Sequence, residues 1–169
     1  VHISNPLDAI AKGVGMVHQH FMQVPNLTVA ENIMLGIEPG RGQWFDQKKA
    51  VALTRQAAEK YQLDVDPNAL IRDLSVGYKQ KVELLKALIR GVRVLILDEP
   101  TGVLTPQETT QFFDVLRNLK KEGYGIIIIT HRMSEIMAIS DKVTILRDGK
   151  QVADLVTADT NPEELSAYM

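Results

Sequence analysis

An unbroken apolar run, Val94-Leu95-Ile96-Leu97, leads directly into two acidic residues, Asp98 and Glu99. The run has the length of a strand and is too short for an independent helix. Continuous apolarity without alternation is typical of a parallel strand that is buried on both faces. We therefore expect a parallel sheet that contains this strand, with both carboxylates at its carboxyl edge. In α/β folds that edge is where ligands bind.

Short β-branched runs alternate with helical patterns along the chain, which predicts an α/β domain with a mostly parallel sheet. Strands are expected at 13–18, 94–97, 126–130, 142–147 and 151–156, and helices at about 29–35, 48–63, 75–91, 106–119 and 133–139. Asn161 and Pro162 predict the start of a last helix. A loop that contains Trp44 separates the first two helices. Residues 1–169 are predicted to form part of one domain, in which the mostly helical stretch of about 47–91 is an inserted subdomain and 92–169, with the acidic pair and Thr130-His131, is the C-terminal part.

Composition limits the class of protein. The chain has 169 residues, 45% of them hydrophobic and 24% charged, which is enough for one core and gives no sign of disorder. The formal net charge of -2 does not indicate a nucleic-acid partner. No apolar run approaches the ~20 residues that a membrane-spanning helix requires. The lack of cysteine excludes a disulfide framework.

A second candidate site is the start of the helix expected after Leu74. Ser75, Val76 and Gly77 would place a hydroxyl, free backbone N–H groups and a glycine where phosphate can approach a helix N-terminus. Ser75 could equally be an ordinary N-cap, because a Ser-x-Gly sequence is common. The acidic pair has its own alternative, a buried strand followed by a solvated turn. The two motifs support each other because this helix leads directly into the acidic strand.

Together these motifs resemble those of ATP-binding-cassette (ABC) ATPases. The segment 74–106, LSVGYKQKVELLKALIRGVRVLILDEPTGVLTP, resembles the block from the signature motif to the Walker B acids. The segment 17–21, VHQHF, resembles the Q-loop, and Thr130-His131 resembles the H-loop. More narrowly, 13–36 and 99–108 resemble the first ATPase half of bacterial simple-sugar and nucleoside importers, which usually carry two cassettes in one polypeptide. The resemblance implies a P-loop NTPase-like fold.

The resemblance assigns catalytic roles by position. Glu99 would orient or deprotonate an attacking water, and Asp98 would hold Mg²⁺, directly or through water. Gln19 would approach both the Mg²⁺ and the water, and His131 would contact the γ-phosphate of ATP. Taken alone, Gln19 would be interpreted as a polar residue that ends a strand. His131 alone would be interpreted as a hydrogen-bonded structural histidine.

The resemblance also implies contacts with other chains. Ser75, Val76 and Gly77 would act in trans, on ATP held by a second ABC cassette, either fused or homologous. The segment after the Q-loop would dock on transmembrane permease subunits through apolar side chains: Phe21, Met22, Val24, Leu27 and Val29. The alternative is ordinary packing of this segment against the helical subdomain. A solute-binding lipoprotein would be an indirect partner, and no nucleic acid is expected.

A phosphate-binding loop of the form G-x-x-x-x-G-K-[ST] does not occur in the 169 residues. The Gly149-Lys150 pair is followed by Gln151 and lies at an expected hairpin turn. By resemblance, the Walker A strand, loop and helix would precede Val1, so we interpret the chain as an N-terminally truncated cassette. The missing strand would lie between those at 126–130 and 143–146, which should then keep open edges. Thr105 stands where many cassettes have Asp, although the sugar and nucleoside group commonly has Thr.

The resemblance therefore predicts an ATPase subunit that uses ATP and Mg²⁺ to power import of a nucleoside or simple sugar. It would lie peripherally on the cytoplasmic face of the bacterial inner membrane. Two alternatives stay open: a catalytically incompetent cassette fragment that acts as an interaction module, and a non-transport ABC ATPase of DNA repair or ribosomes. The latter would be expected to carry a long coiled-coil insertion or a basic arm, and the sequence shows neither.

Overall fold

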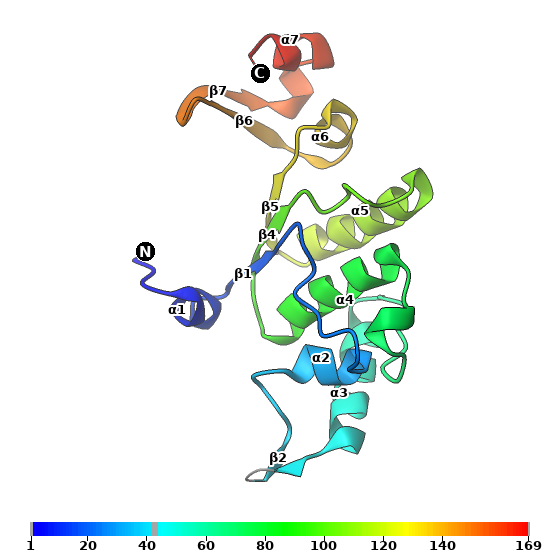
Figure 1. Cartoon of the computed structure of the whole chain (residues 1–169). Helices are drawn as coiled ribbons and strands as arrows, with labels where there is room; N and C mark the ends of the chain where they lie inside the picture. The colour runs from blue at the N-terminus through cyan, green and yellow to red at the C-terminus, as the bar shows by residue number, and fades with distance from the viewer. Residues whose placement is uncertain (1, 42–43, 169) are drawn as a thin grey trace. The chain divides into compact units, whose positions relative to one another are not determined.

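The computed structural model describes residues 2–41 and 44–168, and the chain divides into two compact units, Val1–Ile129 and Thr130–Met169 (Figure 1). The first unit contains, in chain order, α1 (Pro6–Ala11), β1 (Val14–Val17), α2 (Val29–Met34), β2 (Gly40–Arg41), β3 (Trp44–Phe45), α3 (Gln47–Lys60), a 3-10 turn (Ile71–Asp73), α4 (Val76–Ile89), β4 (Val94–Asp98), α5 (Pro106–Lys121) and β5 (Gly125–Ile129). The second unit contains α6 (Met133–Ile139), β6 (Lys142–Arg147), β7 (Lys150–Val156), a 3-10 turn (Thr157–Asp159) and α7 (Pro162–Tyr168).

A three-stranded parallel sheet with the order β1-β4-β5 organises the first unit, as the alternating pattern predicted. The strand that carries the acids, β4, is the central one. Val17 at the end of β1 pairs with Leu97, and Asp98 pairs with Ile129 at the end of β5. Helix α4 contacts β1, and α5 contacts β5. The carboxyl ends of all three strands therefore meet at one edge.

The two faces of this sheet differ in exposure. Leu95 and Leu97, on one face of β4, are completely buried, whereas Ile96 on the other face is only half-buried. Met16 and Ile127 pair with Ile96 from the neighbouring strands and are 42% and 52% exposed. The expectation that β4 is buried on both faces is therefore wrong. Alternate side chains of a strand point to opposite faces, and here only one face is fully covered.

The two strands that the resemblance led us to expect with an open edge, β5 and β6, each have one in the described structure. Within the described residues, β5 pairs only with β4, and its side chains Ile127 and Ile129 are 52% and 48% exposed. In the second unit, β6 pairs only with β7 over the same described ranges. An unpaired, apolar strand edge can accept a further strand.

Helices α2, α3 and α4 contact one another and form one cluster of helices in the first unit (Figure 1). Local signals in the sequence explain where helices begin. Thr28 and Thr105 start α2 and α5 with capping boxes, and Ser75 is the N-cap of α4. The sequence analysis did not identify α1, although Asn5 caps it and Pro6 opens it. It also predicted a loop around Trp44, where the structure has the short antiparallel strands β2 and β3.

The second unit is an antiparallel hairpin with two short helices around a small core: Ile136, Val143, Ile145 and Leu165. Asp148 and Gly149, with φ of 51° and 72°, form the predicted two-residue turn between β6 and β7. The side chain of Asn161 accepts a hydrogen bond from the backbone N–H of Glu164 and caps α7, as predicted.

Candidate functional site

The ends of β1 and β4 bring two of the predicted site residues together. Gln19 Nε2 donates a hydrogen bond to Glu99 Oε2 at 3.4 Å. The strand pairing explains this contact. Val17 lies opposite Leu97, so Gln19 and Glu99, each two residues further along, lie side by side where the strands end. Both side chains stand at the carboxyl edge, where α/β folds bind ligands.

The backbone of Glu99 adopts an unusual conformation. Its φ is 43°, in the left-handed region, which is unfavourable for a residue with a side chain and unusual for one that precedes proline. Two hydrogen bonds support the conformation: Glu99 N–H donates to the Ile129 carbonyl at 2.9 Å, and the Glu99 carbonyl accepts from Gly102 N–H at 3.2 Å. Backbone strain of this kind is concentrated at functional sites and persists only where the surroundings enforce it.

The acidic pair offers oxygen ligands for a metal ion. Asp98 is the last residue of β4, Glu99 follows it, and both are half-buried. Mg²⁺ usually binds one or two carboxylates and takes its other ligands from water and substrate phosphates. Over residues 2–41 and 44–168, no group of three or more His, Cys, Asp or Glu side chains could hold a metal ion. Asp98 and Glu99 thus supply the one or two carboxylates that a Mg²⁺ ion bound together with phosphate groups would need.

The predicted signature residues lie at the start of α4. Ser75 Oγ accepts a hydrogen bond from the backbone N–H of Tyr78 at 3.4 Å, and Val76 is 40% exposed. Gly77 is buried, because the side chain of Glu108 from α5 lies against it. A hollow of about 90 Å³ lies between the starts of these two helices. The sequence analysis missed Glu108, although the Thr-x-x-Glu spacing of a capping box could have identified it.

His131 lies in the second unit, on the turn that leads into α6. Thr130 Oγ1 donates to Glu135 Oε2 and accepts from Arg132 N–H, both at 3.1 Å. Arg132 and the buried Glu135 form an ion pair at 3.2 Å. The turn is therefore fixed on both sides of an exposed histidine.

The predicted docking segment has both exposed and buried members. Met22 and Val24 are 67% and 43% exposed, and Phe21 and Leu27 are half-buried. Val29 is completely buried in the first turn of α2, so its side chain cannot contact a partner. Its inclusion in the docking surface is therefore wrong, because α2 turns that position into the core.

Side-chain and backbone hydrogen bonds hold this segment in place. The buried Asn32 side chain accepts from Val24 N–H at 2.7 Å and donates to the carbonyls of Val24 and Thr28 at 3.1 and 3.0 Å. The backbone from 25 to 30 also bonds to residues 67–72, which precede the signature residues. Gln23 Nε2 donates to the carbonyl of Lys79 in α4 at 2.8 Å. The docking segment and the signature helix are therefore directly connected.

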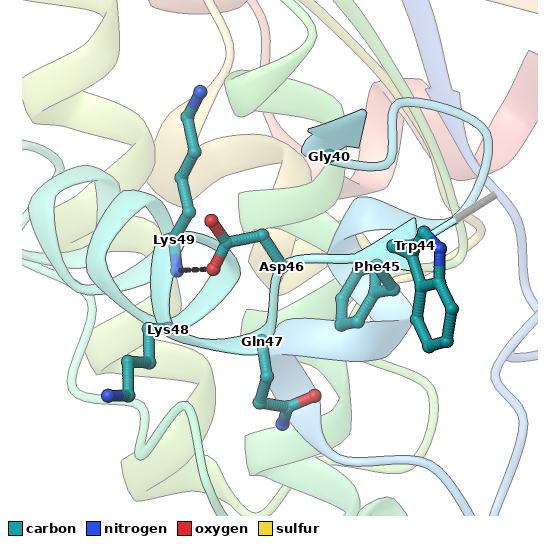
Figure 2. A pocket seen from close by; sticks show the side chains of 7 residues that line it. All are labelled: Gly40, Trp44, Phe45, Asp46, Gln47, Lys48 and Lys49. Carbon is teal, nitrogen blue, oxygen red and sulfur yellow. Dashed lines mark hydrogen bonds between the residues drawn. The ribbon is translucent and has the colours of Figure 1, made fainter. Parts of the chain in front are cut away.

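A larger hollow, of about 630 Å³, lies away from these residues at the start of α3 (Figure 2). It is lined by Gly40, Trp44, Phe45, Asp46, Gln47, Lys48 and Lys49. Asp46 caps α3 by accepting from Lys49 N–H at 2.9 Å, and Trp44 is 85% exposed. None of the predicted site residues lines this hollow, so we assign it no role in the chemistry.

Comparison with known proteins agrees with these motifs. The family described as ABC transporter matches residues 2–102. The chain belongs to the ABC transporter family. The nucleoside import ATP-binding protein NupA of Lactococcus lactis subsp. cremoris is 48% identical over 168 residues, which cover 99% of this chain and 33% of NupA. The guanosine import ATP-binding protein NupO of Bacillus subtilis is also 48% identical, over 100% of this chain and 33% of NupO. The ABC chain thus spans about a third of the length of these relatives.

A solved structure shows the same fold. It is the ADP conformation of MJ1267, an ATP-binding cassette of an ABC transporter, with a TM-score of 0.80 and 21% identity. The similarity covers 98% of this chain and 71% of that one. The ABC chain therefore has the α/β fold of an ATP-binding cassette, as the sequence predicted.

Proposed function

We propose that this ABC family member is the ATP-binding subunit of a membrane importer and hydrolyses ATP to drive uptake of a nucleoside or simple sugar. The observation that carries the proposal is the hydrogen bond between Gln19 and Glu99 at the carboxyl edge of the sheet. It joins the two side chains that would handle the attacking water. The printed names of NupA and NupO, both import ATP-binding proteins, support the choice of solute class.

Within this proposal, each polar residue at the sheet edge has a separate task. Glu99 orients the attacking water or accepts its proton, and the hydrogen bond from Gln19 restricts the position of its carboxylate. Asp98 holds Mg²⁺, directly or through water, and Gln19 lies close enough to Glu99 to reach the same ion. When bound, Mg²⁺ neutralises charge on the phosphates of ATP. His131 contacts the γ-phosphate.

The proposed partners use two other surfaces. Ser75, Val76 and Gly77 act on ATP held by a second ABC cassette, through the N–H groups at the start of α4. Met22 and Val24 dock on a transmembrane permease subunit, with Phe21 and Leu27 beside them. None of the helices within 2–41 and 44–168 is long and apolar enough to cross a bilayer. We place the protein peripherally on the cytoplasmic face of the membrane, and a solute-binding lipoprotein acts on it only indirectly.

ATP hydrolysis by the complete gene product, with and without Glu99→Gln, tests the proposal. The substitution keeps the size of the side chain and removes its ability to accept a proton. We expect the rate to fall by about a hundredfold or more, as is usual for a positioned general base. Glu59→Gln removes an exposed carboxylate of α3 and should leave the rate unchanged. Equal rates for wild type and Glu99→Gln would refute the assignment of Glu99.

Crosslinking tests the docking surface. The chain contains no cysteine, so Met22→Cys or Val24→Cys introduces a single reactive site within it. We expect either variant to crosslink to the permease in assembled transporters, while the exposed Gln56→Cys on α3 should not. Crosslinks from Gln56 alone would remove the docking proposal.

A further inference from the structure

The start of α4 is in tight contact with a side chain of α5. A Cβ added to Gly77 would overlap Glu108 Oε1 and would lie 2.7 Å from Glu108 Cδ and 3.3 Å from Cγ. The backbone of Gly77 is helical and has no positive φ, so alanine could adopt it without strain. The need for glycine at this position therefore arises from the neighbouring carboxylate and not from backbone geometry.

Glu108 cannot move away from Gly77 without losing other bonds. Its Oε2 accepts from both the backbone N–H and the Oγ1 of Thr105, each at 2.9 Å. In return, Thr105 Oγ1 accepts from the N–H of Glu108 at 3.3 Å. Hydrogen bonds from Thr105, together with the charge of Lys81, hold the pKa of Glu108 below its usual value. One carboxylate therefore lies against the signature glycine and completes the capping box at Thr105, where the loop after the acidic pair ends and α5 begins.

We propose that Glu108 is a positioning residue that links the signature turn, Ser75–Gly77, to the loop 102–105 after the Walker B acids. The loop begins next to the site, because Gly102 N–H bonds to the Glu99 carbonyl. The proposal rests on the proposed function, in which the signature turn contacts a nucleotide. A displacement of the signature turn would push on Glu108, release Thr105 and loosen the loop that leads back to Glu99.

The chain contains a second capping box that serves as a matched control for the one formed by Thr105 and Glu108. Glu31 and Thr28 form a second capping box, with Glu31 Oε2 accepting from Thr28 N–H at 2.7 Å and from Thr28 Oγ1 at 2.8 Å. No glycine that the structure describes has Glu31 among its nearest neighbours. Glu31→Ala therefore removes a similar cap without touching Gly77.

A thermal double-mutant cycle in the complete gene product tests the link. Gly77→Ala is introduced into wild type, Glu108→Ala and Glu31→Ala. Gly77→Ala should lower Tm in wild type, because the added methyl group displaces Glu108 and breaks its cap. In the Glu108→Ala background, where no cap is left to break, the change in Tm should be more favourable by about 2–4 °C, the effect of one cap in a domain of this size. The change in the Glu31→Ala background should equal that in wild type. An equal change in all three backgrounds would overturn the proposal.

Amide hydrogen exchange reports the link directly. Gly77→Ala should speed exchange of the Thr105 amide by about fivefold, the equivalent of one lost cap, and leave the Thr28 amide unchanged. Glu108→Gln keeps an acceptor oxygen in place and should preserve protection of Thr105, whereas Glu108→Ala should not. If the Thr105 amide exchanges at the wild-type rate in Gly77→Ala, the proposal is wrong.

Kinetics separate positioning from simple stability. Glu108→Ala should lower kcat for ATP hydrolysis about threefold or more with KM unchanged, because initial binding of ATP does not involve this link. Glu31→Ala should change neither constant, and Glu108→Gln should restore most of kcat. A raised KM with unchanged kcat would overturn the positioning role. If wild type hydrolyses no ATP, the proposed function fails, while the thermal and exchange results still decide whether the link exists.

Discussion

The sheet edge and the start of α4 would both handle phosphate groups, yet they are built in different ways. At the sheet edge, Glu99 has a φ of 43° and meets Gln19 from a neighbouring strand. At α4, Ser75 has an ordinary extended N-cap conformation, with φ of -63° and ψ of 163°, and a regular helix follows. One region is strained and depends on side chains, and the other is unstrained and depends on its backbone.

The difference suggests what each region has to do. A carboxylate that acts on a water molecule must be fixed to within fractions of an ångström, and neighbouring strands can enforce a conformation that a free loop would not keep. A helix start already presents its N–H groups and needs only to be placed correctly. For Glu99, the Ile129 carbonyl and the Gly102 N–H provide the constraint. For Gly77, the contact with Glu108 provides the placement.

In the proposed function both regions would act on phosphates that other residues hold, and this gives the largest expected effect. Purified residues 1–169 should show no Mg²⁺-dependent ATP hydrolysis above background, because they contain no G-x-x-x-x-G-K-[ST] loop to position the phosphates. The complete gene product, assayed in parallel, is the reference. Steady hydrolysis by residues 1–169 that Glu99→Gln abolishes would mean that a phosphate site exists among them.

The second prediction tests the strain at Glu99 by comparing Glu99→Asn with Glu99→Gln. Both variants remove the charge, but Asn accepts a positive φ more readily than Gln. We expect Glu99→Asn to be more stable by about 1 kcal/mol, which raises Tm by about 2–4 °C relative to Glu99→Gln. Neither variant should hydrolyse ATP efficiently. Equal Tm values would indicate that the backbone at this position stores no strain, and the contrast with Ser75 would then disappear.

Local signals made most of the elements predictable from the sequence. Ser75, Pro106 and Asn161 mark helix starts, and the apolar runs mark β4 and β5, because capping and strand periodicity depend on neighbours along the chain. The motif order also predicted the family and the fold. Confirmation of the fold does not extend to residue roles, so those of Gln19, Glu99 and His131 stay proposals.

Features that depend on contacts between distant segments could not be predicted in this way. The close approach of Glu108 to Gly77 joins residues of two different helices, and no local pattern reports it. Val29 looked like a surface residue because its segment is apolar, but α2 buries it. The exposed face of β4 escaped prediction for a similar reason, since four apolar residues in a row do not show how much of each face is covered.

The smallest expected effect concerns pH, and it tests the Thr105–Glu108 cap at the start of α5, whose carboxylate lies against the start of α4. Hydrogen bonds from Thr105, and then the charge of Lys81, lower the pKa of Glu108 from its ordinary value of 4.5. A lowered pKa means that the unfolded chain takes up this proton first as the pH falls. The cap therefore contributes its full stability above about pH 4.5 and loses it as the pH falls through the lower, folded-state pKa.

The Tm of wild type should accordingly fall more steeply below about pH 4.5 than the Tm of Glu108→Gln, which has no proton to take up at this position. The difference should be small, because Glu108 is accessible to solvent. Asp8, whose pKa is lowered chiefly by its hydrogen bond with Lys12, contributes in the same direction from α1. Asp8→Asn therefore serves as a matched variant that should make the fall of Tm with pH less steep without changing α4 or α5. Thr105→Val should remove the Glu108 contribution as Glu108→Gln does, and a slope that keeps its wild-type steepness in both variants would show that this cap does not set the pH response.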